Sequence, residues 1–99
     1  MRYGVGSELT GKIVWITGGG SGLGRAMALE FAGRGAKVAV SGRRVERLEE
    51  TVAAIEAKGV DGFAVPCDVT DEGSQASAIA AVIGHFGQLD VAVANAGFG

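Results

Sequence analysis

The sequence contains very little cysteine and proline. One of its 99 residues is a cysteine, Cys67, and one is a proline. A single thiol excludes an internal disulfide and a metal site built from several cysteines, and it fits a reducing compartment. We interpret Cys67 as an inert buried thiol. With one proline and 47% hydrophobic residues, the composition is that of a folded globular domain and not of a disordered chain.

The chain also lacks a strong charge of either sign and a long apolar run. A net charge of −2 and an isoelectric point near 5.3 argue against a nucleic-acid surface and against a polybasic membrane anchor. Residues 1–11 lack the apolar stretch of a signal peptide, and no run is long enough to span a bilayer. We therefore expect a cytoplasmic protein that binds neither nucleic acid nor membrane.

The residues that are present alternate between two hydrophobic periodicities. Short runs rich in β-branched residues predict strands, and apolar residues three and four positions apart predict helices. The expected strands are residues 12–17, 37–41, 62–66 and 89–94, and the expected helices are residues 23–34, residues 44–58 and a third one capped by Thr70 or Asp71. Gly35 is placed to end the first helix in the left-handed conformation, and Gly59 follows the second. The third helix should bury a stripe formed by Ile79, Val82, Ile83 and Phe86.

This order of elements predicts an α/β fold. Each connection between two strands is long enough to hold a crossover helix, so the strands should be parallel. Right-handed crossovers then make a Rossmann-type, doubly wound sheet with the strand order 3-2-1-4 the expected topology. We expect residues 1–8 to form a disordered tail and residues 9–99 to form part of a nucleotide-binding domain that is truncated after the fourth strand.

Five glycines lie between the first strand and the first helix, in the stretch TGGGSGLG of residues 17–24. The stretch falls where the strand order reverses, and open α/β sheets bind ligands at that point. We assign Gly18 to the turn out of the strand, Gly22 to the close approach of a pyrophosphate, and Gly24 to tight packing of the helix on the sheet. The spacing T-G-x-x-x-G-x-G lacks the G-K-[ST] ending of a nucleoside-triphosphate loop, which disfavours ATP or GTP hydrolysis. The alternative is a merely flexible glycine loop.

A second signal lies at the end of the second strand, in the sequence VSGRR. A carboxylate at this place usually binds the adenosine ribose of NAD, whereas an arginine accommodates the 2′-phosphate of NADP. Here Arg43 and Arg44 follow the strand and no carboxylate does, and a guanidinium can bind a phosphate with two hydrogen bonds. We therefore predict NADP(H) as the cofactor in preference to NAD(H). The alternative is a solvated basic start to the second helix, which suits Arg47 better than a binding role.

Three stretches share their order and spacing with a known family. They are LTGKIVWITGGGSGLGRA at residues 9–26, CDVTD at residues 67–71 and LDVAVANAG at residues 89–97. With these motifs the chain resembles the short-chain dehydrogenase/reductase family from residue 9 to residue 97. The resemblance implies an NADP-dependent oxidoreductase that moves hydride between the cofactor and a small alcohol or ketone, in a full-length protein that forms a homo-oligomer.

The same resemblance implies roles for individual residues. Gly18, Ser21, Leu23 and Gly24 would line the phosphates and ribose of the cofactor, and Arg43 would bind the 2′-phosphate. Asp68 and Val69 would hold the adenine, and Asn95, Ala96 and Gly97 would lie along the cofactor at the end of the fourth strand. A simple loop or capping carboxylate is the alternative for Asp68. For His85, near the end of the third helix, we expect a favourable contact with the helix dipole and no catalytic role.

Two departures from the family pattern limit these expectations. The usual double asparagine before Ala-Gly is Ala94-Asn95 here, so one side-chain amide is missing and the sheet edge should be looser. The family's catalytic serine and Tyr-x-x-x-Lys pair lie beyond the fourth strand, and the single tyrosine of this chain, Tyr3, is not followed by a lysine four residues later. We expect these 99 residues alone to be inactive, and to be marginally stable or self-associating because the fourth strand is an open edge.

Two other functions remain as alternatives. A non-catalytic dinucleotide-binding or sensor module would need only the glycine loop and the basic strand end. A methyltransferase also holds an adenosine near a glycine-rich turn, but we would expect a carboxylate at the end of its second strand. Gly42 and Arg43 at that place argue against it.

Overall fold

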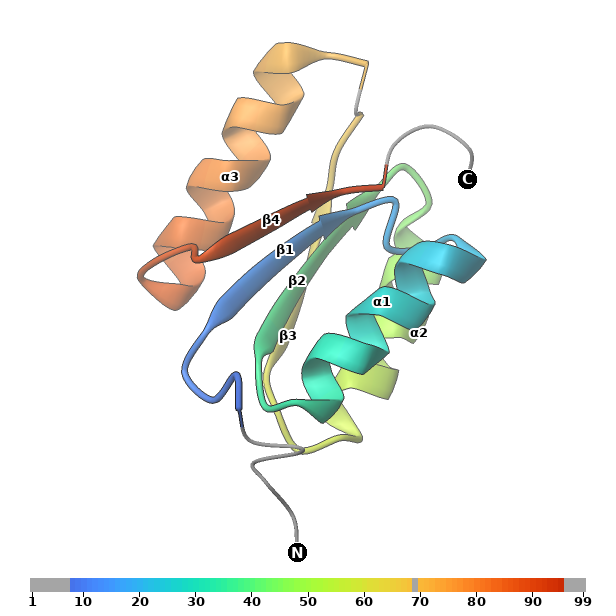
Figure 1. The fold of residues 1–99 in the computed structure, drawn as a ribbon. Helices are drawn as coiled ribbons and strands as arrows, with labels where there is room; N and C mark the ends of the chain where they lie inside the picture. The colour runs from blue at the N-terminus through green and yellow to red at the C-terminus, as the bar shows by residue number, and fades with distance from the viewer. Residues whose placement is uncertain (1–7, 69, 96–99) are drawn as a thin grey trace, which may run out of the picture.

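The structure, a computed structural model, describes residues 8–68 and 70–95. Strands and helices alternate along the chain, as the periodicity predicts (Figure 1). The elements are β1 (Ile13–Thr17), α1 (Gly22–Gly33), β2 (Lys37–Gly42), α2 (Val45–Glu56), β3 (Gly62–Pro66), α3 (Glu72–Phe86) and β4 (Val91–Ala94). No helix in this part of the chain is long and apolar enough to cross a membrane.

The four strands form one parallel sheet in the order β3-β2-β1-β4. The central strand β1 places Thr17 opposite Ser41 of β2 on one side and opposite Ala94 of β4 on the other. The carboxyl ends of these three strands therefore meet at one edge of the sheet. The predicted Rossmann-type, doubly wound topology is confirmed.

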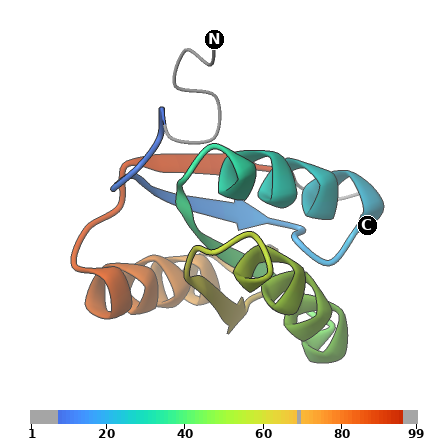
Figure 2. The ribbon, with the colours of Figure 1, turned by 90° about the horizontal axis from the view of Figure 1, so that it is seen from below.

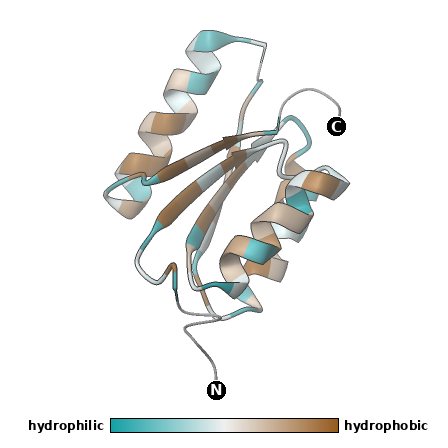
Figure 3. Ribbon diagram, viewed as in Figure 1, coloured by the Kyte–Doolittle hydropathy of each residue, from teal (hydrophilic) through white to brown (hydrophobic). Residues whose placement is uncertain are grey.

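Helices cover both faces of the sheet, with α1 and α2 on one face and α3 on the other (Figures 1 and 2). Both faces need cover because parallel strands are apolar on both sides, and the hydrophobic residues concentrate along the strands (Figure 3). Fully buried side chains on the α1 and α2 face include Val14, Ile16, Val38, Val40, Leu48 and Ile55. Each such side chain contributes about 1.5–3 kcal/mol to folding.

The helix ends follow the expected chemistry. Asp71, and not Thr70, caps α3, because its Oδ1 accepts hydrogen bonds from two N–H groups of the first turn at 2.9 and 3.4 Å. Gly35 follows α1 with a φ of 96°, which confirms the predicted left-handed ending. Gly59 follows α2 with a φ of 92°.

The predicted buried stripe of α3 is partly wrong. Val82 is fully buried, whereas Ile83 is 43% exposed. Ala78 takes the buried place beside Val82 because its small side chain lets the helix lie close to the sheet. Ile79 and Phe86 pack against this core as partly buried residues. Apolar residues surround α3 on most sides, so their spacing alone does not select the face that packs.

The fourth strand begins two residues later than predicted. Asp90 lies before β4, and its backbone N–H donates to the Ile13 carbonyl oxygen at 2.9 Å. Its carboxylate Oδ2 accepts from the Ile13 N–H at 2.8 Å. The side chain therefore takes the place that a strand carbonyl would occupy, and regular pairing starts only at Val91.

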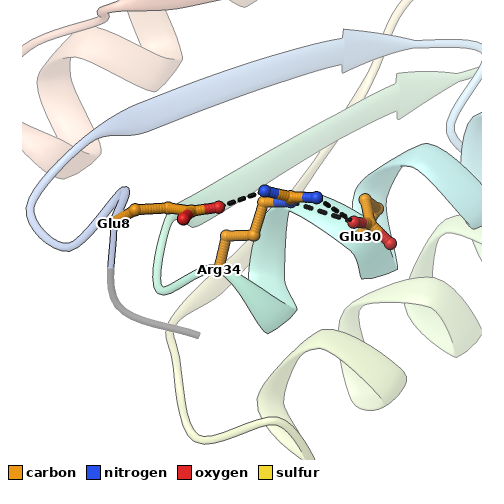
Figure 4. A network of polar contacts seen from close by, with 3 residues as sticks. All are labelled: Glu8, Glu30 and Arg34. Atoms are coloured by element: carbon orange, nitrogen blue, oxygen red, sulfur yellow. Dashed lines mark hydrogen bonds and ion pairs between the residues drawn. The ribbon is translucent and has the colours of Figure 1, made fainter. Parts of the chain in front are cut away.

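The amino-terminal side of the sheet carries an ion-pair network (Figure 4). Arg34, just after α1, contacts Glu8, and its Nη2 lies 2.8 Å from Oε2 of Glu30. These hydrogen bonds, first that of Glu30 and then that of Glu8, raise the pKa of the Arg34 guanidinium. The groups are solvent-exposed, so the network adds little stability. Residues 1–7 of the predicted disordered tail lie outside the described residues, and the tail stays a prediction.

His85 makes an aromatic contact that the sequence does not reveal. Its ring stacks on Phe63 of β3, with centroids 3.9 Å apart and planes 3° from parallel. The Phe86 ring lies edge-on to the His85 ring at 4.7 Å. His85 thus joins the end of α3 to the outer strand of the sheet.

Candidate functional site

The glycine loop joins β1 to α1 at the carboxyl edge of the sheet. Gly18 has a φ of 70°, so the predicted turn out of the strand is confirmed. A Cβ at Gly24 would overlap the Gly18 carbonyl oxygen and lie 2.9 Å from Nδ2 of Asn95. The close packing expected of Gly24 is therefore present, and it is directed at the loop and at the end of β4.

Gly22 differs from these two glycines. Its φ is not positive, and a Cβ added there would meet no atom within 4 Å. Neither backbone conformation nor packing therefore requires a glycine at this position. Gly22 is the first residue of α1, and Leu23, which is 65% exposed, is the second. In the described part of the chain their N–H groups have no hydrogen-bond acceptor. The bare backbone thus leaves open space in front of unpaired amides at the positive end of the helix dipole.

Ser21 and Asn95 hold this loop in place. The Ser21 hydroxyl accepts from the Gly24 N–H at 3.1 Å, which caps α1, and donates to the Gly18 carbonyl oxygen at 2.7 Å. The Asn95 side-chain amide donates to the same hydroxyl at 3.1 Å. The backbone N–H of Asn95 donates to Oγ1 of Thr17 at 3.1 Å. Both residues therefore act first on the geometry of the loop.

A cavity of about 590 Å³ opens beside the loop. Its walls come from the glycine loop, the end of β2, the first turn of α2 and the segment after β3. The lining residues are Gly18, Gly20, Ser21, Gly42, Arg43, Arg44, Arg47, Leu48, Cys67, Asp68, Thr70 and Asn95. The structure thus brings together six residues predicted for the site, namely Gly18, Ser21, Arg43, Arg44, Asp68 and Asn95.

Three other predicted site residues do not line this cavity. Gly22 lines a neighbouring hollow, Leu23 is exposed on α1, and Gly24 is buried under the loop. Val69, Ala96 and Gly97 lie outside the described residues.

The cavity has a positive balance of charge. Arg43, Arg44 and Arg47 line it, and within residues 8–68 and 70–95 none of the three forms an ion pair. Asp68 is the single carboxylate of the lining. Unpaired guanidinium groups on a concave wall suit an anionic ligand.

Asp68 is held by its neighbour Thr70. Its Oδ1 accepts from the Thr70 hydroxyl at 2.7 Å and from the Thr70 N–H at 3.0 Å. These hydrogen bonds lower the pKa of the Asp68 carboxyl, and the positive charge of Arg43 lowers it further. Asp68 therefore has the loop contacts of the alternative interpretation, and it also lines the cavity.

Two residues of the site escaped the sequence analysis. Thr51 of α2 is 1% exposed, and its hydroxyl donates to the Gly19 carbonyl oxygen at 3.0 Å. It lies at helical spacing from Leu48 and Ile55, so the buried stripe of α2 was the signal that could have found it. Arg47, interpreted as part of a solvated helix start, is exposed and also lines the cavity.

These features fit a ligand that carries more than one anionic group. Space in front of unpaired amides suits a pyrophosphate, and a neighbouring cavity with unpaired arginines suits a second anionic group. A family model described as short chain dehydrogenase matches residues 12–99. The chain belongs to the short-chain dehydrogenase family. Members of this family are oxidoreductases that use a nicotinamide nucleotide.

Curated members of the short-chain dehydrogenase family support this membership. The chain is 43% identical over 90 residues to a hydroxynaphthalene reductase of Aspergillus fumigatus, covering 90% of this chain and 33% of that protein. It is 37% identical over 94 residues to human dehydrogenase/reductase SDR family member 7, covering 91% of this chain and 28% of that protein. The chain thus spans about a third of the length of these relatives.

Solved structures of short-chain dehydrogenases share the fold. An NAD⁺-bound xylitol dehydrogenase matches with a TM-score of 0.89 at 34% identity, over 93% of this chain and 35% of that one. The apo form of a glucose dehydrogenase of Caenorhabditis elegans matches with a TM-score of 0.85 at 43% identity, over 94% of this chain and 40% of that one.

Proposed function

We propose that this chain is the NADP(H)-binding part of a short-chain oxidoreductase that interconverts an alcohol and a ketone. The observation that carries the proposal is that Arg43 and Arg44, which form no ion pair among the described residues, line a cavity beside the glycine loop. A carboxylate at the end of β2 would repel a ribose phosphate, and Gly42, Arg43 and Arg44 offer none there. The choice of NADP(H) over NAD(H) rests on this contrast.

Each part of the site has a binding task in this proposal. The N–H groups of Gly22 and Leu23 bind the pyrophosphate, while Ser21 and Asn95 keep the loop in the shape that presents them. Arg43 and Arg44 bind the 2′-phosphate with charge-assisted hydrogen bonds. When bound, the nicotinamide coenzyme would supply the hydride donor or acceptor.

The roles assigned to the far ends of the coenzyme come from the family motifs. Asp68 and Val69 hold the adenine, and Asn95, Ala96 and Gly97 lie along the coenzyme where β4 ends. This chain contains one tyrosine, Tyr3, and it lacks the Tyr-x-x-x-Lys pair that handles the proton in the family. We propose that these residues bind and orient the coenzyme and are inactive by themselves.

The substitution Arg43→Asp tests the choice of coenzyme. We expect the unchanged protein to bind NADP⁺ more tightly than NAD⁺, as measured by isothermal titration calorimetry. Arg43→Asp should weaken NADP⁺ binding by about 10- to 100-fold, through loss of a charge-assisted hydrogen bond and added repulsion. NAD⁺ binding should change little.

Lys58→Asp is the matched control. It makes the same change of charge just beyond the carboxyl end of α2, away from the cavity. It should leave the ratio of the two dissociation constants unchanged. An Arg43→Asp protein that keeps its preference for NADP⁺ would overturn the proposal.

A further inference from the structure

We propose that Arg47 is a specificity-determining residue of the coenzyme site, and that it contacts the 2′-phosphate together with Arg43. This inference rests on the proposed NADP(H) function. It adds a contact from the first turn of α2 to those from the end of β2. Four observations about Arg47 support it.

The first observation is the close packing of Arg47 on the glycine loop. A Cβ added at Gly20 would lie 3.0 Å from the Cβ of Arg47. The start of the Arg47 side chain therefore lies directly over the loop backbone, 27 positions away in sequence. Gly20 permits this approach, so the loop and the first turn of α2 form one continuous wall.

The second observation is that Thr51 fixes the backbone of Arg47 relative to the loop. The buried Thr51 hydroxyl lies 3.0 Å from the Gly19 carbonyl oxygen and 3.1 Å from the Arg47 carbonyl oxygen. The Arg47 N–H donates to the Arg44 carbonyl oxygen at 3.1 Å, which joins it to the basic strand end. The backbone of Arg47 is thus held between the loop and Arg44, so only its side chain has to be ordered when a ligand binds.

The third observation concerns the charge that Arg47 offers. Within the described ranges its guanidinium has no ion pair, although it has acidic neighbours on α2. A charge already neutralised by a carboxylate would add little to phosphate binding, and Arg47 is not in that state.

The fourth observation distinguishes the two hollows that Arg47 lines. In the smaller hollow the charges of Arg25 and Arg47 are balanced by those of Glu46 and Glu50. In the larger cavity Arg43, Arg44 and Arg47 face a single carboxylate, that of Asp68. A phosphate therefore gains more from Arg47 in the larger cavity, where Arg43 also lies.

The test compares Arg47→Gln with the unchanged protein by titration calorimetry. Glutamine keeps the aliphatic start of the side chain over Gly20 and removes the charge. We expect NADP⁺ binding to weaken by about tenfold, the loss of one charge-assisted hydrogen bond. NAD⁺ binding should change by less than about twofold, and adenosine 2′,5′-bisphosphate should weaken as NADP⁺ does.

Lys58→Gln is the matched control. It removes one positive charge just beyond the carboxyl end of α2, and Lys58 lines neither hollow. An equal loss of NADP⁺ affinity in this variant would show that Arg47 acts only through the overall electrostatic potential of the protein. That result would overturn the inference. Equal losses for NADP⁺ and NAD⁺ in Arg47→Gln would also overturn it, because the contact would then be with the pyrophosphate.

The two proposals fail in different ways. If the unchanged protein does not prefer NADP⁺, the proposed function and this inference both fail. If the unchanged protein prefers NADP⁺ and Arg43→Asp abolishes the preference while Arg47→Gln leaves it intact, the inference alone fails. Thermal unfolding of each variant checks that the loss of affinity occurs in folded protein.

Discussion

The side-chain amide of Asn95 lies 3.1 Å from the Ser21 hydroxyl, so the end of β4 is hydrogen-bonded to the residue that caps α1. The two residues are 74 positions apart in sequence. Ser21 in turn caps α1 through the Gly24 N–H. The geometry of the glycine loop therefore depends on β4 as well as on its own sequence.

Asn95→Ala should weaken coenzyme binding without any loss of a charged contact. Removal of the amide takes one hydrogen bond from the Ser21 hydroxyl and loosens the loop. We expect the dissociation constants of NADP⁺ and NAD⁺ to rise alike, by about three- to tenfold. The free energy of unfolding should fall by about 1 kcal/mol. Calorimetry and urea unfolding measure the two effects. Gln88→Ala, which removes an exposed amide before β4, should leave both affinities unchanged. A selective loss for NADP⁺ in Asn95→Ala would contradict this explanation.

Gly24→Ala should lower stability, whereas Gly22→Ala should not. A methyl at Gly24 overlaps the Gly18 carbonyl oxygen, so we expect a loss of about 2–3 kcal/mol in the free energy of unfolding. A methyl at Gly22 meets no protein atom, and stability should stay the same or rise by up to about 1 kcal/mol. The same methyl stands where a pyrophosphate would approach. Gly22→Ala should therefore weaken the binding of NADP⁺ and of NAD⁺ by about tenfold or more.

Gly84→Ala is the control for these two variants. Gly84 lies in α3, and a Cβ there meets nothing within 4 Å. It should raise stability by about 0.5–1 kcal/mol and leave coenzyme binding unchanged. Unaltered binding in a stable Gly22→Ala protein would show that the space in front of α1 holds no phosphate.

The Asp68 carboxylate should make stability depend on pH in the acid range. Because its pKa is lower in the folded chain, the folded state favours the ionised form, and this contribution is complete above the unfolded pKa of about 3.9. It is lost as the pH falls through the lower folded value. The stability difference between the unchanged protein and Asp68→Asn should be constant from pH 7 to about pH 5 and shrink below about pH 4.

Urea unfolding at a series of pH values measures this difference. The same comparison in a Thr70→Val background supplies the control. The hydrogen bond from the Thr70 hydroxyl is the largest cause of the lowered pKa of Asp68, and valine removes it. In the Thr70→Val background, the stability difference between Asp68 and Asp68→Asn should shrink less at low pH. A difference that grows as the pH falls would have the wrong sign for a lowered pKa.

The open side of β4 should promote self-association of this chain. Among the described residues β4 pairs with β1 alone, and Val91 is 38% exposed on it. Such an edge offers unpaired backbone groups to another strand. We expect a sedimentation coefficient that rises with concentration, and Ala92→Lys should reduce the rise by placing a charge on the edge. Equal concentration dependence in both proteins would locate the contact elsewhere.

The sequence predicts the sheet and the loop well because both depend on local signals. The β-branched run of residues 12–17 and the five glycines after it define a buried strand and a turn without reference to the rest of the chain. Strand order follows from the length and handedness of the crossovers. The basic residues at the end of β2 then fall beside the loop because β1 and β2 pair in register.

Other parts of the site depend on contacts between distant residues. The packing of Arg47 on Gly20 exists only because α1 and α2 lie on one face of the sheet, and no spacing within the helix reveals it. The same holds for the Thr51 hydrogen bond to the loop. For α3, Ile83 and Ala78 show that when a helix is apolar on several sides, the packing surface of the sheet selects the buried face.

Trp15 is the only tryptophan in the chain, and its buried indole N–H donates to the Ser41 hydroxyl at 2.8 Å. Ser41 stands two positions before Arg43, and its carbonyl oxygen accepts from the Gly19 N–H at 3.0 Å. One chromophore is therefore coupled to the strand end and to the loop. Its fluorescence provides a label-free optical signal from the place where these segments meet.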